Sequence, residues 1–205
     1  MTSVLIVTSS FISIVAPIPY IFGVVAGRTK PRVVSWLTFA RMGCLVGAAA
    51  LSDGQYPAAA LALCAVLTGG LVAILGLKHG DRRFTSLDVA CQAGALFGLA
   101  LWVALDSPEA CLVTQILVSI VAMVPTLLHC WRRPDEEKLI TYALYALGGA
   151  VAVFAAVVGG AWGITAILYP TYITVMDLAL CGLIVAGSSR DRAAMVSRAV
   201  PDDVA

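Results

Sequence analysis

Residues 57–83, PAAALALCAVLTGGLVAILGLKHGDRR, hold the pattern that decides the fold. Residues 57–77 carry no charged side chain, and Lys78, Arg82 and Arg83 follow within a few positions. A helix of about 20 apolar residues crosses the hydrocarbon core of a bilayer. The pattern therefore predicts one transmembrane helix that ends at a basic loop.

Six further apolar stretches of similar length occupy most of the chain. With 60% apolar and 12% charged residues, the chain has too little polar surface to shield itself in water. We therefore predict an all-α polytopic membrane protein with a single transmembrane domain at residues 1–187. No soluble catalytic domain remains, so any chemistry must occur among the helices. The predicted spans are residues 3–26, 33–51, 57–77, 88–105, 111–130, 139–160 and 164–187.

The basic residues indicate the orientation of the spans. Short loops that keep Lys and Arg are typically cytoplasmic, and every basic residue except Arg41 falls in one of four clusters in alternate gaps between the spans. The N-terminus is therefore predicted outside and the C-terminus inside a cell membrane, with residues 188–205 as a cytoplasmic tail. The clusters are Arg28, Lys30 and Arg32; Lys78, Arg82 and Arg83; Arg132, Arg133 and Lys138; and Arg190, Arg192 and Arg198.

A weak internal repeat divides the chain into two halves. The same three features recur in each half: a proline near the end of a span, a basic loop with a second proline, and a hydroxyl–aromatic pair. Because the first and fifth spans run in the same direction, we predict parallel three-helix repeats at residues 3–77 and 111–187, joined by the helix at 88–105. This plan resembles the PQ-loop and SWEET membrane proteins, although Tyr20 and Thr126 stand where that family has Gln. The recurring residues are Pro19, Pro31 and Ser35-Trp36, then Pro125, Pro134 and Thr141-Tyr142.

Several short motifs together show a closer resemblance. They are Pro19-Tyr20-Ile21 with Thr29-Lys30-Pro31 and Ser35-Trp36, Leu77-Lys78-His79-Gly80-Asp81 with Asp88, Pro125-Thr126 with Pro134 and Glu137, and Leu168-Tyr169-Pro170. The chain thereby resembles a family of small bacterial seven-span proteins that includes integral-membrane terpene cyclases of the drimentine type. The resemblance implies cyclisation of a prenyl chain on an indole diketopiperazine in secondary metabolism. It also implies an upstream prenyltransferase as a partner.

The intramembrane carboxyl groups fit such chemistry. Cyclisation by protonation needs an acid in an apolar pocket, aromatic faces that stabilise cations, and exclusion of water. Asp177 lies near the middle of the last span, and Asp88 lies at the cytoplasmic start of the fourth. Burial disfavours the ionised form of a carboxyl group, so we predict that one of the two is the general acid. Asp177 gives the sharper signal because a charge at that depth is costly.

Each carboxyl group also has a structural interpretation. Asp177 can form a buried ion pair with Arg41, which would make it a base or a polar anchor. Asp88 can cap the helix that it begins. Gln92 and Trp102 share a helical face with Asp88, and that face can border a pocket. Both pairs of interpretations stay open at the level of the sequence.

Aromatic residues within the spans are candidates for the pocket wall. Trp36 begins the second span, Tyr142 and Tyr145 lie on successive turns of the sixth, and Tyr169 lies two turns before Asp177. An interfacial aromatic belt is the alternative interpretation. The predicted substrate-binding residues are Arg41, Trp36, Gln92, Trp102, Tyr142, Tyr145 and Tyr169.

Metal-dependent chemistry is not expected. His79 and His129 are the only histidines, no Asp-rich diphosphate motif occurs, and the six cysteines are scattered without metal-ligand spacing. We therefore predict no metal and no cofactor. The basic clusters are too short for a nucleic-acid partner, so the expected partners are membrane lipids and a prenylated substrate that enters from them. We interpret the carboxylates of the cytoplasmic loops as solvated side chains: Asp81, Asp135, Glu136 and Glu137.

Two other classes of function are compatible with the sequence. The repeats suit a transporter of a small solute, with a site near the middle of the membrane that includes Asp177 and Arg41. The glycine pairs suit a non-catalytic scaffold in which helices pack closely. A scaffold does not explain Asp177.

Overall fold

The computed structural model describes residues 2–29, 31–80, 82 and 85–199, and these form helices and no strand. Lys30, Asp81, Arg83 and residues 200–205, together with the side chains of His79, Pro125 and residues 193–199, lie outside this part. The helices are α1 (Thr2–Val15), α2 (Ile18–Val25), α3 (Val33–Ser52), α4 (Tyr56–His79), α5 (Ser86–Leu105), α6 (Pro108–Arg132), the 3-10 helix η1 (Pro134–Glu136), α7 (Leu139–Val158) and α8 (Ile164–Ala199).

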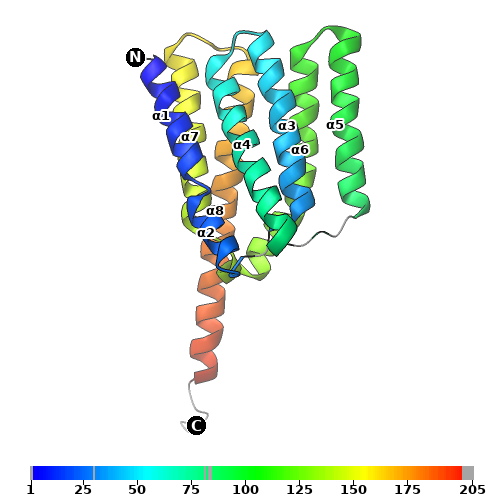
Figure 1. Ribbon diagram of the computed structural model, residues 1–205. Helices are drawn as coiled ribbons and strands as arrows, with labels where there is room; N and C mark the ends of the chain where they lie inside the picture. Colours follow the sequence, from blue (N-terminus) through cyan, green and yellow to red (C-terminus); the bar gives the residue numbers. More distant parts are fainter. Residues whose placement is uncertain (1, 30, 81, 83–84, 200–205) are drawn as a thin grey trace.

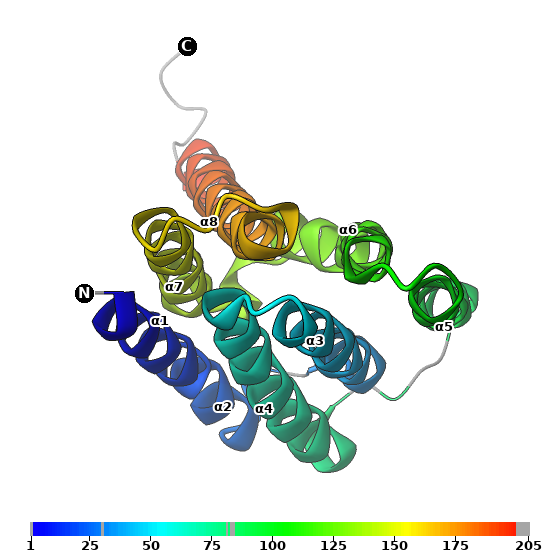
Figure 2. The same ribbon diagram turned by 90° about the horizontal axis from the view of Figure 1, so that it is seen from above.

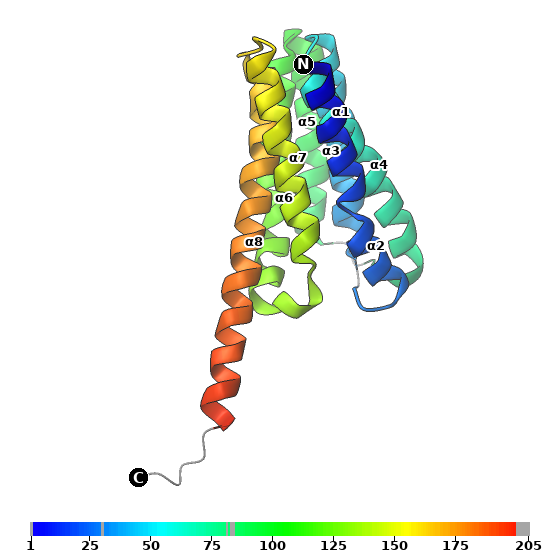
Figure 3. The same ribbon diagram turned by 90° about the vertical axis from the view of Figure 1, so that its left-hand side faces the viewer.

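Seven of these segments are long and apolar enough to cross a membrane, counting α1 and α2 as one. The predicted all-α, seven-helix fold is therefore confirmed. The spans begin and end within three residues of the predicted bounds, except at the end of α8. That helix continues through the predicted tail as far as Ala199 and projects from the bundle (Figure 1; Figure 3).

The first span is broken between α1 and α2. Pro17 and Pro19 both lack a backbone N–H, so neither can donate an intrahelical hydrogen bond. The chain makes a turn at residues 16–17 and resumes as α2. Beyond the break, α2 carries Tyr20 to a buried position, 4% exposed. The kink thus directs an aromatic side chain into the bundle.

The two halves have the same order of neighbouring helices. In the first half α4 packs against both α1 and α3, and in the second half α8 packs against both α7 and α6 (Figure 2). The halves meet where α1 packs on α7 and α3 on α6. This order is compatible with parallel repeats, which stay a prediction. Helix α5 stands at the edge of the bundle, mainly against α6 (Figure 2).

Small side chains bring the two halves close together. Ser9 of α1 donates a hydrogen bond of 2.7 Å to the carbonyl oxygen of Gly148 in α7. A side chain at Gly148 would meet the Ser13 hydroxyl, because a Cβ there lies 2.5 Å from it. Close packing of this kind is typical of helix pairs in membranes.

The loops that hold the basic clusters gather at one end of the bundle, together with the extension of α8 (Figure 1). We call this the basic end. It includes residues 26–32, 80–85 and 133–138, of which 30, 81, 83 and 84 are not described. The N-terminus lies at the opposite end (Figure 1). Whether the basic end is cytoplasmic stays a prediction.

Candidate functional site

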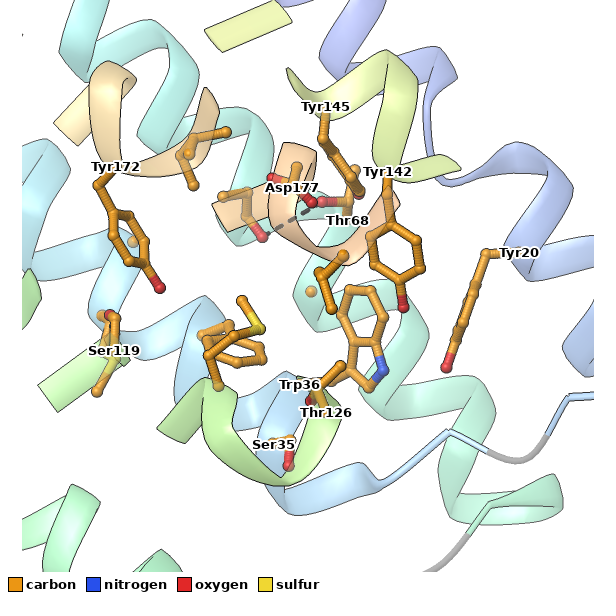
Figure 4. A pocket seen from close by; sticks show the side chains of 18 of the residues that line it. Tyr20, Ser35, Trp36, Thr68, Ser119, Thr126, Tyr142, Tyr145, Tyr172 and Asp177 are labelled. Carbon is orange, nitrogen blue, oxygen red and sulfur yellow. Dashed lines mark hydrogen bonds between the residues drawn. The ribbon is translucent and has the colours of Figure 1, made fainter. Parts of the chain in front are cut away.

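A cavity of about 600 Å³ lies inside the bundle, between the two halves. Side chains from every span except α5 line it, and it reaches the basic end through the loop residues Arg32, Thr85 and Glu137. Its wall is rich in aromatic rings, several of which are shown in Figure 4. The aromatic lining residues are Tyr20, Trp36, Phe39, Tyr142, Tyr145, Tyr169 and Tyr172.

Asp177 lies in the interior of this cavity. It is 13 residues from the start of α8, or about 20 Å along the helix axis, and it is 7% exposed. Thr68 and Tyr145 lie beside it (Figure 4). Within the described part of the chain its carboxyl group has no ion pair and no hydrogen bond. An uncompensated carboxylate in such a place is costly, so the surroundings favour the neutral acid.

Helix periodicity explains why α8 contributes so much of the wall. Tyr169, Tyr172, Ile173, Asp177 and Leu180 are separated by steps of three or four residues, apart from one adjacent pair, and so share one face of the helix. The rings of Tyr169 and Tyr172 stack at 6.4 Å between centroids. The acid therefore shares its helix face with two aromatic rings.

The opposite wall holds a second aromatic pair. The rings of Tyr20 and Trp36 lie 5.2 Å apart and are tilted by 50°. Tyr142 lies next to them (Figure 4). Tyr20 and Trp36 come from the first half of the chain, and Tyr142 and Tyr169 come from the second, so both halves supply aromatic faces to one space.

Three hydroxyl groups that line the cavity are buried without a hydrogen-bond partner in the part of the chain that the structure describes. They belong to Ser13, Tyr145 and Tyr172. Buried polar groups usually have partners. Three such hydroxyl groups in the cavity that holds Asp177 suit a site that handles protons or polar atoms of a ligand.

Glu137 is a second buried carboxyl group, at the basic end of the cavity. Its side chain is 7% exposed, and it accepts a hydrogen bond of 2.7 Å from the Tyr142 hydroxyl. The imidazole Nε2 of His129 lies 3.7 Å from its Oε1. Burial raises the pKa of this carboxyl above its usual value, whereas the Tyr142 hydrogen bond and the proximity of His129 act against the rise.

The interpretation of Glu137 as a solvated loop residue is therefore wrong. Pro134 is buried, and η1 packs against α6 and α8, so the loop is folded against the bundle instead of extending into solvent. Hydropathy gives no signal of this, since the local sequence is Pro-Asp-Glu-Glu-Lys. The nearest sequence signal is the membership of Glu137 in the motifs quoted for the family resemblance.

Asp88 makes the contacts of a helix cap. Its carboxylate accepts a hydrogen bond of 2.7 Å from the backbone N–H of Thr85 within a capping box at the start of α5. It also pairs with Arg32 at 2.6 Å. Arg32 and Thr85 line the cavity, but Asp88 is not among the described residues that do. These contacts match the structural interpretation of Asp88.

The structure separates the other predicted site residues into two groups. Trp36, Tyr142, Tyr145 and Tyr169 line the cavity with Asp177. Gln92 and Trp102 belong to α5 at the edge of the bundle, and the Gln92 amide donates to the Thr38 hydroxyl at 2.6 Å. They are not among the described residues that line the cavity.

Arg41 does not pair with Asp177 in the described part of the chain. Its Nε and Nη2 atoms are buried there without a hydrogen-bond partner. Arg41 is not among the described residues that line the cavity with Asp177. This leaves Asp177 without the cation that would make it a stable carboxylate.

Potential metal ligands are dispersed. No group of three or more His, Cys, Asp and Glu side chains that suits a metal ion occurs among the described residues. The six cysteines are free thiols at separate positions. No protein-family model, curated protein or solved structure matches the chain.

Proposed function

We propose that the protein is an integral-membrane terpene cyclase of the cell membrane. It cyclises a prenyl chain, by our proposal a farnesyl group on a natural product such as an indole diketopiperazine, by protonation and without a metal. The observation that carries the proposal is a cavity that Asp177, whose carboxyl group has no partner in the described part of the chain, lines together with seven aromatic side chains. The family resemblance of the sequence points to the same chemistry.

The size and lining of the cavity support a prenyl substrate. A volume of about 600 Å³ falls within the usual range of about 300–1,000 Å³ for small-molecule sites. The described wall offers apolar and aromatic surface over most of its length, and its charged residues are Asp177 and those at the basic end. A prenyl chain fits the interior, and a polar head group fits the basic end. The substrate is supplied from the lipid phase after an upstream prenyltransferase has attached the chain.

The reaction begins with the neutral carboxylic acid of Asp177. Its proton adds to a terminal alkene of the chain, whose π electrons form the new C–H bond and leave a carbocation on the neighbouring carbon. The π electrons of the next alkene then form the C–C bond of the ring. Aromatic faces such as those of Tyr169, Tyr172 and Trp36 stabilise the cations. Loss of a proton from the last cation gives a cyclic isomer of unchanged mass, with a cavity hydroxyl such as that of Tyr172 assisting.

The test is a product assay with Asp177 variants. Cells that supply a farnesylated cyclic dipeptide express the protein, and membrane extracts are examined by mass spectrometry and NMR. The wild type should give a cyclic isomer, and Asp177→Asn should lower its formation by about 10²-fold or more because the general acid is lost. Glu109→Gln, at the exposed start of α6, is the control and should behave as the wild type. Product formation at the wild-type rate by folded Asp177→Asn protein would refute the role of this acid.

Transport of a small solute is the second candidate function. The observation that favours it is the equivalent order of helices in the two halves, with the cavity between them. Such a plan suits alternating access. A transporter requires a sealed vesicle and shows counterflow of labelled solute, whereas the cyclase works equally well in detergent. Activity that is lost on solubilisation of a stable protein therefore favours transport.

A further inference from the structure

The cavity contains two buried carboxyl groups at different depths. Asp177 lies inside, and Glu137 lies at the basic end, directly before α7. The proposed reaction leaves Asp177 as a carboxylate after each proton transfer to the substrate. A new proton must reach it before the next turnover, although the residue is 7% exposed. The protein therefore needs a route for protons from water to the interior.

The side chains around Glu137 form a graded connection to water. His129 and Glu136 are 42% and 39% exposed, and they lie 3.3 Å apart, between imidazole Nε2 and a carboxylate oxygen. The same imidazole nitrogen lies 3.7 Å from Glu137, which is 7% exposed. Glu137 in turn accepts from the Tyr142 hydroxyl at 2.7 Å. Each step leads from a solvated group to a more buried one.

The route continues inward through the cavity, which both Tyr142 and Tyr145 of α7 line. Tyr142 and Tyr145 are three residues apart and lie on one face of the helix. The Tyr145 hydroxyl has no hydrogen-bond partner among the described residues, and its side chain lies beside Asp177 and Thr68 (Figure 4). A hydroxyl group both donates and accepts a proton. The Tyr145 hydroxyl can therefore relay a proton to Asp177.

Glu137 is suited to hold the proton at the start of this route. Burial raises the pKa of its carboxyl, so it binds a proton more readily than a solvated glutamate. Titratable groups approach it from four elements, and no Lys or Arg pairs with it in the described part of the chain. These groups are Tyr142 of α7, His129 and Cys130 of α6, Glu136 of η1 and Tyr20 of α2.

We propose that His129, Glu137 and Tyr142 form a proton inlet that reloads Asp177 after each turnover. The inference rests on the proposed cyclase function. A proton from water passes through His129 to Glu137, and Tyr142 gives its own proton inward while it takes one from Glu137. Water in the cavity carries this proton to the Tyr145 hydroxyl, and the carboxylate of Asp177 receives a proton from that hydroxyl. The substrate releases one proton to water, so the protons balance over the cycle.

The experiment measures the first turnover separately from later ones. Purified wild type, Glu137→Gln and Asp135→Asn proteins are mixed with a threefold excess of farnesylated cyclic dipeptide, and product is followed by quenched sampling. Glu137→Gln should form about one product per protein at the wild-type rate and then slow by about 10²-fold. Asp135→Asn, which changes an exposed carboxylate of η1 that is not among the described lining residues of the cavity, should show no such slowing.

The pH profile and a second variant complete the test. The wild-type steady-state rate should fall as pH rises through the pKa of Glu137, and this fall should be absent in Glu137→Gln. Tyr142→Phe keeps the ring and should slow later turnovers in the same way, so the test does not depend on the folding of one variant. Wild-type rates after the first turnover in Glu137→Gln, or a folded Glu137→Gln protein without a first product, would overturn the proton inlet. Failure of the cyclase proposal is different, since the wild type would then form no cyclic product.

Discussion

At the residue scale, the two carboxyl groups of the cavity differ in what surrounds them. Asp177 faces aromatic rings and hydroxyl groups within the membrane span, and no cation compensates it in the described part of the chain. Glu137 lies outside the spans, with one hydrogen bond from Tyr142 and an imidazole nearby. The first arrangement suits an acid that gives its proton to an apolar substrate. The second suits a group that exchanges its proton with water.

Glu137 should make the stability of the protein depend on pH. Its pKa is raised in the folded state, so the native protein binds this proton more tightly than the unfolded chain, whose glutamates titrate near pH 4.3, roughly. The stabilising contribution is therefore complete below that value and is lost as pH rises through the folded pKa. In detergent, the thermal unfolding midpoint of Glu137→Gln should rise relative to the wild type as pH increases. A constant difference between the two proteins across pH would contradict this prediction.

The sequence identified one of these two residues. Asp177 stands out because any ionisable residue in an apolar span is costly. Glu137 does not stand out because its neighbours are polar, and only the folding of Pro134 and η1 against the bundle buries it. The sequence allows an ion pair between Arg41 and Asp177 as one interpretation of Asp177. The two side chains do not pair in the described part of the chain. Helix rotation decides which way Arg41 points, and the apolar residues all around α3 give little indication of that rotation.

At the scale of the elements, α5 illustrates a limit of patterns within single helices. Asp88, Gln92 and Trp102 do recur at helical spacing, but α5 packs at the edge of the bundle. Which helix occupies the edge depends on contacts between distant segments. The start of α5 was more predictable, because Thr85 and Asp88 form a capping box.

The variant Asp88→Ala tests whether this carboxyl group is structural. It removes the capping box and the partner of Arg32. We expect a loss of about 1–2 kcal/mol in stability, seen as a lower thermal midpoint in detergent, with the product per folded protein nearly unchanged. Asp88→Asn, a milder change, should lose less stability. If folded Asp88→Asn protein forms no product, Asp88 takes part in catalysis and the catalytic prediction from the sequence is right.

At the scale of the whole molecule, hydropathy and charge were sufficient for the fold class. Seven stretches of about 20 apolar residues leave few alternatives to seven spans, and the described helices follow them closely. The end of α8 was not predicted, since residues 188–199 are too polar for a span but still helical. The shape of the cavity cannot be predicted from the sequence, because it depends on how the two halves of the chain pack against each other.

The orientation of the molecule is open to direct measurement. We expect the basic end inside the cell, because its loops hold the Lys and Arg clusters. A green fluorescent protein fused to the C-terminus should therefore fluoresce, and an alkaline phosphatase fused after Gly54 should be active in the periplasm of a bacterial host. The opposite pair of results would reverse the orientation and place Glu137 on the outer side.

Helix α5, at the edge of the bundle, sets the direction in which the second half crosses the membrane. A unit of three spans begins on one side of the membrane and ends on the other, so a second unit that followed directly would be inverted. In the predicted plan of parallel repeats, one additional crossing restores the direction, and α5 supplies it while contributing no side chain from within its helix to the described cavity wall. To make this crossing, α5 needs only sufficient length and an apolar composition. Most lipid-facing residues of α5 should therefore tolerate apolar substitutions. The residues of its capping box and of the face that packs against α6 should not.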